Sequence, residues 1–485
     1  MSLILRQINR WLDWLTAPIE HPASRRLVQI SLYTAGLALW IWFFRSPANP
    51  VFYTACDWPK EYKYFAVLQA AVAGPTIPWH TDIKLQPSQP TDRFMAIPET
   101  LSPWAPQVQL LRWMPIKTFV IFNTLLLYSI GMAGFFKLCR TCRLAPLPAA
   151  FGFLIFMLNG HIVAHFSAGH TMWSGYFLLP WLLYFIFDGW FNAFTLRHAL
   201  LAALAMGGMA LQGSIHIFIW CLLFLGLLFL TTPSRMRHLI LTLTVAVLLA
   251  LHRLLPAAIT FQPAHQLVRG FPDLAGFAHA FVSRHLYTGS IFPWEFNYYI
   301  SPPGAAIIIL GGILSFHYHR KRADWKLWIP IVLFTVFSFR NYIFAAAAAL
   351  PIPLLTTQRV PGRFLILPLL FLTTIACVNI QTWLNMRPAA DTGKRLAGWL
   401  LAATVAAGGW MMLRHFAWWR MAGTEQHFLR QTPVDWSLMP AMVVRPDVFY
   451  KDSVMIATGI SLATLLVVFV LLRRQRNRRT AETTV

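Results

Sequence analysis

Two acidic residues mark the first polar stretch after an apolar run, in the segment "CDWPKEYKYFAVLQAAVAGPTIPWH". Asp57 stands two residues before Pro59, Glu61 follows one helical turn later, and Gly74 with Pro75 supplies a stop. Proline is favoured in the first turn of a helix, so this pattern predicts an amphipathic helix along the outer membrane surface. Asp57 is then either the N-cap of this helix, worth about 1 kcal/mol, or a carboxylate that takes part in catalysis.

More polar side chains follow in the same loop, in "IPWHTDIKLQPSQPTDRFMAIPETLSPWAPQ". His80, Asp82, Asp92 and Glu99 stand between prolines, which restrict the backbone. A rigid loop that carries acids at a membrane face suits the binding of polar groups. The alternative is ordinary solvation of an exterior loop.

Histidines gather in a second segment, "NGHIVAHFSAGHTMW". His161 and His165 stand one helical turn apart at the end of an apolar run, and His170 opens the next run. A histidine pair at this spacing can bind zinc, but no carboxylate or cysteine lies nearby and no HExxH motif is present. Contact with a polar substrate and packing at the membrane interface are the other interpretations.

Arginines form the third group of candidates. In "LALHRLLPAAITF", His252 and Arg253 fall within an apolar run, where a charged group is costly and faces a cavity, a carboxylate or a lipid headgroup. In "LLTTQRVPGRFLIL", Arg359 and Arg363 flank a Pro-Gly bend, and each guanidinium can donate two hydrogen bonds to a phosphate or pyrophosphate. Snorkelling of Arg253 and headgroup anchoring of the other two are the alternatives.

The composition indicates which elements must position these side chains. The chain has 485 residues, of which 57% are hydrophobic and only 12% are charged. Repeated apolar runs indicate an all-α polytopic membrane protein. Apolar length and the charged turns predict 12 spans, near residues 27–45, 117–136, 144–163, 171–188, 198–212, 214–231, 238–257, 304–318, 327–339, 364–384, 396–413 and 453–472.

The charge pattern predicts the topology. The net charge of +23 would favour a nucleic-acid partner in a soluble domain, but here the basic residues cluster in short loops between apolar runs. We therefore expect no nucleic-acid partner. Both termini are basic and an even number of spans places them on one side, so we expect a bacterial inner (plasma) membrane protein with cytoplasmic termini. The basic turn "KLCRTCR", whose Cys139 and Cys142 form either a plain loop or a redox or zinc pair, also falls on the cytoplasmic side.

The expected organisation follows from these spans. A cytoplasmic amphipathic N-terminus (1–26) precedes a transmembrane core (27–385), further transmembrane helices (386–472) and a basic cytoplasmic tail (473–485). No cleavage site follows the first run at signal-peptide distance, so the first helix is expected to be retained. The outer loops are expected at 46–116, 258–303, 340–363 and 414–452. The first is too long for a simple connector, which predicts a built surface loop with amphipathic helices.

The order of these pieces resembles the GT-C superfamily of membrane glycosyltransferases, and most closely its bacterial YfhO-like branch. The resemblance lies in an acid early in a large first outer loop, followed by "YFAVLQAAVAGPTIPWH", "GFLIFMLNGHIVAHFSAGHTMWSGYFLLPWLL", "LHRLLPAAITF", "YISPPGAAIIILGGI" and "QRVPGRF". Together these segments cover about residues 45 to 385. The chain departs from relatives at Glu61, which is displaced from an adjacent-acid pattern, and at Arg253, where an uncharged amide is expected.

The resemblance implies transfer of a sugar from a polyprenyl-phosphate donor to a lipid or glycan acceptor at the extracytoplasmic face. Asp57 would be the general base on an acceptor hydroxyl, and Arg253, Arg359 and Arg363 would take up charge on the departing phosphate. Glu61, His80 and Asp82 would orient sugar hydroxyls or hold a divalent cation, although no spacing requires a metal. The substrate-contacting histidines would be His165 and His170.

Two other classes of function remain open. A lipid or lipid-linked-sugar transporter also needs many helices and buried arginines, although its charged or broken spans are expected near the midplane, often in repeated halves. A non-catalytic membrane scaffold predicts that replacing Asp57 changes only stability.

Overall fold

The computed structural model describes residues 2–19, 21–46, 52–82, 92–260, 270–284, 293–318, 325–343, 360–386, 392–427 and 442–484. Secondary structure in these ranges is helical apart from one pair of two-residue strands and two isolated bridges. Within them, seven helical segments are long and apolar enough to cross a membrane: Pro22–Phe44, Ile116–Thr141, Pro146–Ser167, Met236–Thr260, Pro361–Asn385, Gly393–Trp419 and Val448–Asn477. The chain is therefore an all-α membrane protein.

Each of the 12 apolar runs expected to span contains a helix. Seven of them coincide with the long segments given above. The other five hold shorter α-helices: α7 (Leu179–Phe191), α8 (Leu196–Leu211), α9 (Ile215–Thr231), α12 (Pro302–Tyr318) and α13 (Trp325–Phe337). A helix needs about 20 residues to cross a bilayer, so length and composition support seven spans, and the count of 12 stays a prediction.

The chain divides into two compact units, and neither is a continuous stretch of sequence. Unit 1 comprises Met1–Arg45, Met132–Ser167 and Ala264–Thr424. Unit 2 comprises Ser46–Gly131, Ala168–Pro263 and Glu425–Val485. Helix α4 (Ile116–Thr141) begins in unit 2 and ends in unit 1.

Unit 1 is a set of closely packed helices. Helix α12 packs on α16 so tightly that a Cβ on Gly311 would lie 2.3 Å from the Cβ of Ala376. Helix α1 (Ser2–Thr16) buries Leu12, while the neighbouring Trp11 is 60% exposed. Besides α12 and α13, the unit contains α1 (Ser2–Thr16), α2 (Pro22–Phe44), α5 (Pro146–Leu158), α6 (Gly160–Ser167), α11 (Leu274–Val282), η5 (Pro293–Phe296), η6 (Pro361–Leu365), α16 (Ile366–Asn385) and α17 (Thr392–Trp419). The short helix α18 (Met421–His427) crosses the boundary to unit 2.

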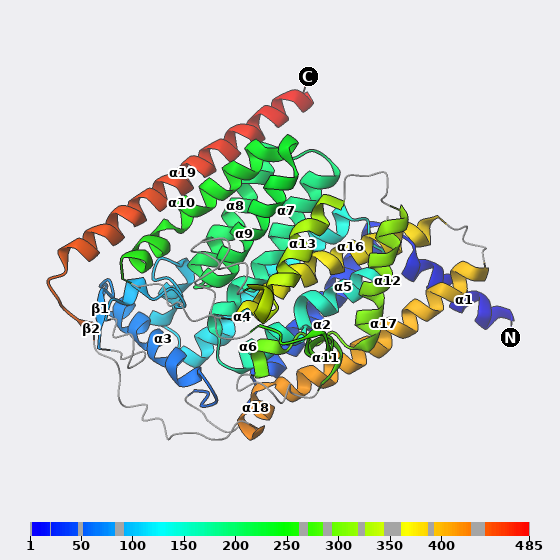
Figure 1. Cartoon of the computed structure of the whole chain (residues 1–485), viewed down its shortest axis with the longest axis horizontal. Coiled ribbons are helices and arrows are strands. Elements are labelled where there is room, and N and C mark those ends of the chain that lie inside the picture. Colours follow the sequence, from blue (N-terminus) through cyan, green and yellow to red (C-terminus); the bar gives the residue numbers. More distant parts are fainter. Residues whose placement is uncertain are drawn as a thin grey trace. The chain divides into compact units, whose positions relative to one another are not determined.

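Unit 2 contains a row of helices in which α19 lies along α10, α10 packs on α8, and α8 packs on α7 (Figure 1). Ser461 of α19 joins the first pair, because its hydroxyl donates to the carbonyl of Leu248 over 2.9 Å. Strand β1 (His80–Thr81) pairs antiparallel with β2 (Met442–Val443). Besides α7, α8 and α9, the unit contains α3 (Trp58–Ala73), η1 (Phe94–Ala96), η2 (Pro106–Arg112), η3 (Thr171–Leu178), η4 (Pro233–Arg235), α10 (Met236–Thr260) and α19 (Val448–Thr484).

The helix predicted after Asp57 is present as α3, which has a proline in its first turn and ends at Gly74. Eight of its 16 residues are buried, and it packs on η2. Gln69 reinforces this packing by donating to the carbonyls of Leu111 and Met114. The helix itself is confirmed, and its apolar side is covered by protein within unit 2.

Candidate functional site

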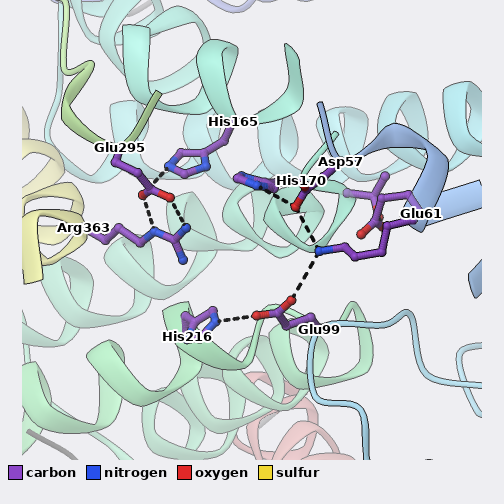
Figure 2. A network of polar contacts seen from close by, with 10 residues as sticks. Asp57, Glu61, Glu99, His165, His170, His216, Glu295 and Arg363 are labelled. Atoms are coloured by element: carbon purple, nitrogen blue, oxygen red, sulfur yellow. Dashed lines mark hydrogen bonds and ion pairs between the residues drawn. The ribbon is translucent and has the colours of Figure 1, made fainter. Parts of the chain in front are cut away.

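Asp57 occupies the N-cap position of α3, but its side chain does not cap the helix. Its backbone has helical dihedral angles, and its carboxylate accepts no capping hydrogen bond from a backbone N–H of the first turn. The Oδ2 atom instead lies 2.9 Å from Nζ of Lys60 and 3.4 Å from Nε2 of His170 (Figure 2). The absence of a capping hydrogen bond contradicts the capping interpretation. The side chain is 42% exposed, so its carboxylate is accessible.

The neighbours of Asp57 keep its carboxylate ionised. Burial alone would raise its pKa, but the hydrogen bond from His170 and the positive charge of Lys60 outweigh burial and hold the pKa well below its usual range. Burial would likewise lower the pKa of Lys60, but Glu99, Glu61 and Asp57 outweigh it and raise that pKa. Both groups are therefore charged at neutral pH.

The network continues from Lys60 to two further side chains of unit 2. Its Nζ atom lies 3.8 Å from Oε2 of Glu99, and Oε1 of Glu99 lies 3.4 Å from Nε2 of His216 (Figure 2). About a third of each of these three side chains is exposed. Carboxylates and nitrogen groups thus alternate along a partly open row, which suits the binding of a polar molecule.

Gly169 allows the backbone beside Asp57 to pack closely. The N–H of Asp57 donates to the carbonyl of Ala168 over 3.0 Å, which joins the start of α3 to the segment that carries His170. Between them, Gly169 has a φ of +87°, and a Cβ there would lie 2.5 Å from the nitrogen of Trp58. Cys56, beside Asp57, has a φ of 54°, a left-handed conformation that costs energy for a residue with a side chain.

Glu61 is in a different environment from Asp57. Its side chain is buried, and its carboxyl accepts a hydrogen bond from the hydroxyl of Thr171, the residue after His170. Burial raises the pKa of Glu61 to about 8, despite the opposing effects of Lys60 and Thr171. Glu61 is therefore mainly protonated at neutral pH, in contrast to the exposed and ionised Asp57.

Arg253 is buried and is already engaged with the backbone of unit 2. Its guanidinium donates to the carbonyls of Met95, Ile97 and Thr100, and to the hydroxyl of Thr100 over 3.0 Å. These bonds fix the segment that carries Glu99. This geometry favours a role in positioning that segment over contact with substrate.

His80 and Asp82 lie at β1. His80 is buried, its ring packs edge-on against Tyr450 with 5.4 Å between centroids, and its Nε2 lies 3.6 Å from Oδ2 of Asp447. Asp447 in turn accepts a 2.8 Å hydrogen bond from Arg93. Asp82 is exposed just beyond the strand. The contacts of His80 are thus with Tyr450 and Asp447, in a second polar group of unit 2.

Unit 1 contains its own buried polar cluster. Arg363, in η6, donates two hydrogen bonds to Glu295 of η5, one of them 2.6 Å from Nε to Oε2 (Figure 2). His165 of α6 completes the cluster, with its Nε2 3.7 Å from the same Oε2. The bidentate geometry expected of Arg363 is present, but the partner is a carboxylate of the chain.

The turn before His165 is made by Asn159 between α5 and α6. Its side-chain oxygen accepts from the backbone N–H groups of His161 and Ile162, at 3.0 and 3.2 Å, and so caps α6. The ring of His161 stacks on Tyr298 with 4.1 Å between centroids, and the Tyr298 hydroxyl donates to the carbonyl of Gly362. His161 therefore has a packing role in the cluster that contains His165.

No group of three or more His, Cys, Asp or Glu side chains suited to a metal ion occurs within the described ranges. Cys139 and Cys142 of "KLCRTCR" form no disulfide, and both are free thiols. Arg359, the other expected phosphate ligand, lies outside the described residues.

Three members of the networks were missed as site residues at the sequence level. Lys60 is one of them: it stands three residues after Asp57, a helical spacing that predicts contact between the two side chains. His216 and Glu295 carried no such local signal, because their partners are distant in sequence.

Comparison with known proteins adds no assignment: no family model matches the chain, and no curated protein matches it significantly.

Replacing Gly169 by alanine should disrupt the contact between Asp57 and His170. The left-handed backbone alone costs an alanine about 1 kcal/mol or more, and the added Cβ would meet the Trp58 nitrogen. We expect a lower melting temperature in detergent. Gly226→Ala is the matched control, because nothing lies within 4 Å of its Cβ position and helix propensity favours alanine. Equal melting temperatures for both variants would contradict this account of Gly169.

Replacing Glu61 by glutamine should stabilise the protein increasingly as pH rises. The unfolded state ionises near pH 4.5 while the folded state stays protonated up to about pH 8, so wild-type stability declines between these values. Glutamine cannot ionise and removes this loss, which amounts to at most about 5 kcal/mol. Thermal unfolding at pH 5 and pH 8 measures the effect. A difference between variant and wild type that stays constant over this range would show that Glu61 is not held protonated.

Proposed function

We propose that the protein is a membrane glycosyltransferase that moves a sugar from a polyprenyl-phosphate-linked donor to a lipid or glycan acceptor. The observation that carries this proposal is the partly exposed carboxylate of Asp57. It is ionised, is not used as a helix cap, and belongs to the segments that resemble the GT-C superfamily.

The arrangement around Asp57 suits a general base. In the transfer, the acceptor hydroxyl gives its proton to the Asp57 carboxylate as its oxygen bonds to the anomeric carbon of the sugar. The bond from that carbon to the carrier phosphate breaks at the same time, and the phosphate leaves with the electron pair. The Nε2 atom of His170 orients the Asp57 carboxylate. This carboxylate stays exposed, so an acceptor hydroxyl can reach it.

The departing phosphate needs positive charge nearby. Lys60 is the candidate in unit 2, because it is charged and 32% exposed. Glu99 also forms an ion pair with Lys60, and Arg253 fixes the segment that carries Glu99 by donating to the carbonyl of Thr100. Arg363 of unit 1 would have to exchange its carboxylate partner Glu295 for a phosphate to act in the same way.

The proposal includes a topology. Twelve spans would place both basic termini in the cytoplasm of a bacterium and the Asp57 network at the extracytoplasmic face of the inner membrane. The carrier lipid would then present its phosphate at the membrane surface where the network lies.

A transfer assay with Asp57→Asn tests the proposal. Purified protein would be given a panel of radiolabelled polyprenyl-phosphate sugars and a membrane extract as acceptor. We expect wild-type transfer and a loss of about 100-fold or more in the variant, because general base catalysis contributes about that much. Asp452→Asn, at an exposed acid on α19, is the control and should keep wild-type activity.

Three results would contradict the proposal in different ways. Equal transfer by wild type and Asp57→Asn would remove Asp57 from catalysis. A loss that follows reduced melting temperature alone would favour the scaffold. No transfer by either protein across the panel, with uptake of the labelled lipid into the opposite leaflet of vesicles, would favour the transporter.

A further inference from the structure

We propose that unit 1 contains a binding site for the phosphate headgroup of an anionic phospholipid, at the basic turn after α4. This site is separate from the Asp57 network and does not depend on the proposed transfer reaction. The observations that carry it are a cavity, three arginines at that cavity, and the backbone conformation of one of them.

The cavity has a volume of about 310 Å³ and lies among the segment before α2, the first half of α2, the end of α4 and the start of α5. That volume is at the lower end of the range for small-molecule sites, about 300 to 1,000 Å³. Most of its lining is apolar, with side chains such as Ile19, Leu32 and Phe136. Such a lining suits the acyl or glycerol part of a lipid.

Three arginines supply the polar part of the lining. Arg25 comes from the first turns of α2, and Arg140 and Arg143 come from the end of α4 and the turn after it. Within the part of the chain that the structure describes, no lining residue of this cavity is acidic. Arg140 and Arg143 are exposed and Arg25 is half-buried. Each of these guanidinium groups can donate two hydrogen bonds to phosphate oxygens.

The backbone holds two of these arginines in place. The N–H of Arg143 donates to the carbonyl of Arg140, and the N–H of Leu144 donates to that of Cys139, which together form a Schellman end to α4. The residue in the left-handed position of this motif is usually glycine, but here it is Arg143, with a φ of 49°. Arg25 is fixed in turn by a 2.9 Å hydrogen bond from its Nη2 to the carbonyl of Ile19. The positions are thus set by the fold, and Arg143 occupies its place against the local backbone preference.

The position of the cavity favours a phosphate that belongs to a lipid headgroup over a free phosphate ion. It lies beside the first half of α2 and the end of α4, two of the segments long and apolar enough to cross a membrane. A phosphate at the end of a spanning helix lies at headgroup level, and its acyl chains extend along the apolar surface of the helices. Charge attraction between basic residues and anionic lipids is strongest on the cytoplasmic side, where the positive charge of this turn is expected.

Thermal unfolding of the full-length protein in a neutral detergent tests the site. The probes are short-chain phosphatidylglycerol, phosphatidylcholine of the same chain length, and inorganic phosphate. We expect phosphatidylglycerol to raise the melting temperature of wild type at concentrations where the other two have little effect. In Arg140→Gln/Arg143→Gln, the apparent affinity should fall about tenfold or more, as expected for loss of charge-assisted hydrogen bonds.

Two further variants separate loss of the site from other effects. Arg143→Gly relieves the left-handed backbone, so we expect it to fold at least as stably as wild type and still to respond less to phosphatidylglycerol. Arg473→Gln/Arg474→Gln removes the same number of charges from exposed positions in the C-terminal tail and should keep the wild-type response.

Each alternative result would overturn the proposal. Equal shifts with phosphatidylcholine would show that apolar chains alone bind. Equal or larger shifts with inorganic phosphate would assign the cavity to a free anion. An unchanged response in the Arg140/Arg143 variants, or an equal loss in the tail variant, would show that the arginines of the cavity do not bind the headgroup.

Discussion

The cost of placing a charge in apolar surroundings governs the polar interactions of this protein. An isolated charge away from water is so unfavourable that it must be paired, bonded to several dipoles, or neutralised. The described residues show all three solutions: Arg363 pairs with Glu295, Arg253 binds backbone carbonyls, and Glu61 takes up a proton. Asp57 differs from these, because it keeps its charge through His170 and Lys60 and remains accessible.

The difference between accessible and buried charged groups distinguishes the reactive Asp57 from the residues that support it. Glu61 and Asp57 are four residues apart, but burial turns the first into a neutral partner of Thr171, while His170 and Lys60 keep the second as an anion. The same contrast applies to the arginines. Arg253 donates through both Nη atoms to the segment that carries Glu99, so it acts on the network through the backbone. A single acidic side chain therefore carries the proposed chemistry, and its neighbours determine its charge and direction.

The helices were largely predictable from the sequence because apolar length and turn residues are local signals. Every expected span contains a helix, and α3 has the predicted proline in its first turn and the predicted glycine as its C-cap. Whether the five shorter helices cross a membrane depends on their neighbours and on the bilayer, which length alone does not fix. Spacing also permits Asp57 as an N-cap, but the backbone of Asp57 is itself helical and its carboxylate accepts no hydrogen bond from the N–H groups of the first turn.

Among the ion pairs of the Asp57 network and the Glu295 cluster, only the one between Asp57 and Lys60 is local in the sequence. The candidates Asp57, His165, His170 and Arg363 all belong to polar networks, whereas Glu99, His216 and Glu295 join them through contacts across long stretches of chain. Spacing identifies which residues can do chemistry, but not which partner occupies them. This is why Arg253 was expected to meet a phosphate and was instead found bonded to carbonyls.

The central claim is that Asp57 accepts the proton of the acceptor during a direct displacement. The stereochemistry of the transferred sugar tests it most directly, because a base and a nucleophile give opposite results at the anomeric carbon. Proton NMR of the product formed by purified wild-type protein, compared with the configuration in the polyprenyl-phosphate donor, measures that outcome. Inversion is the predicted result, and retention, or a sugar found covalently bound to Asp57, would contradict it.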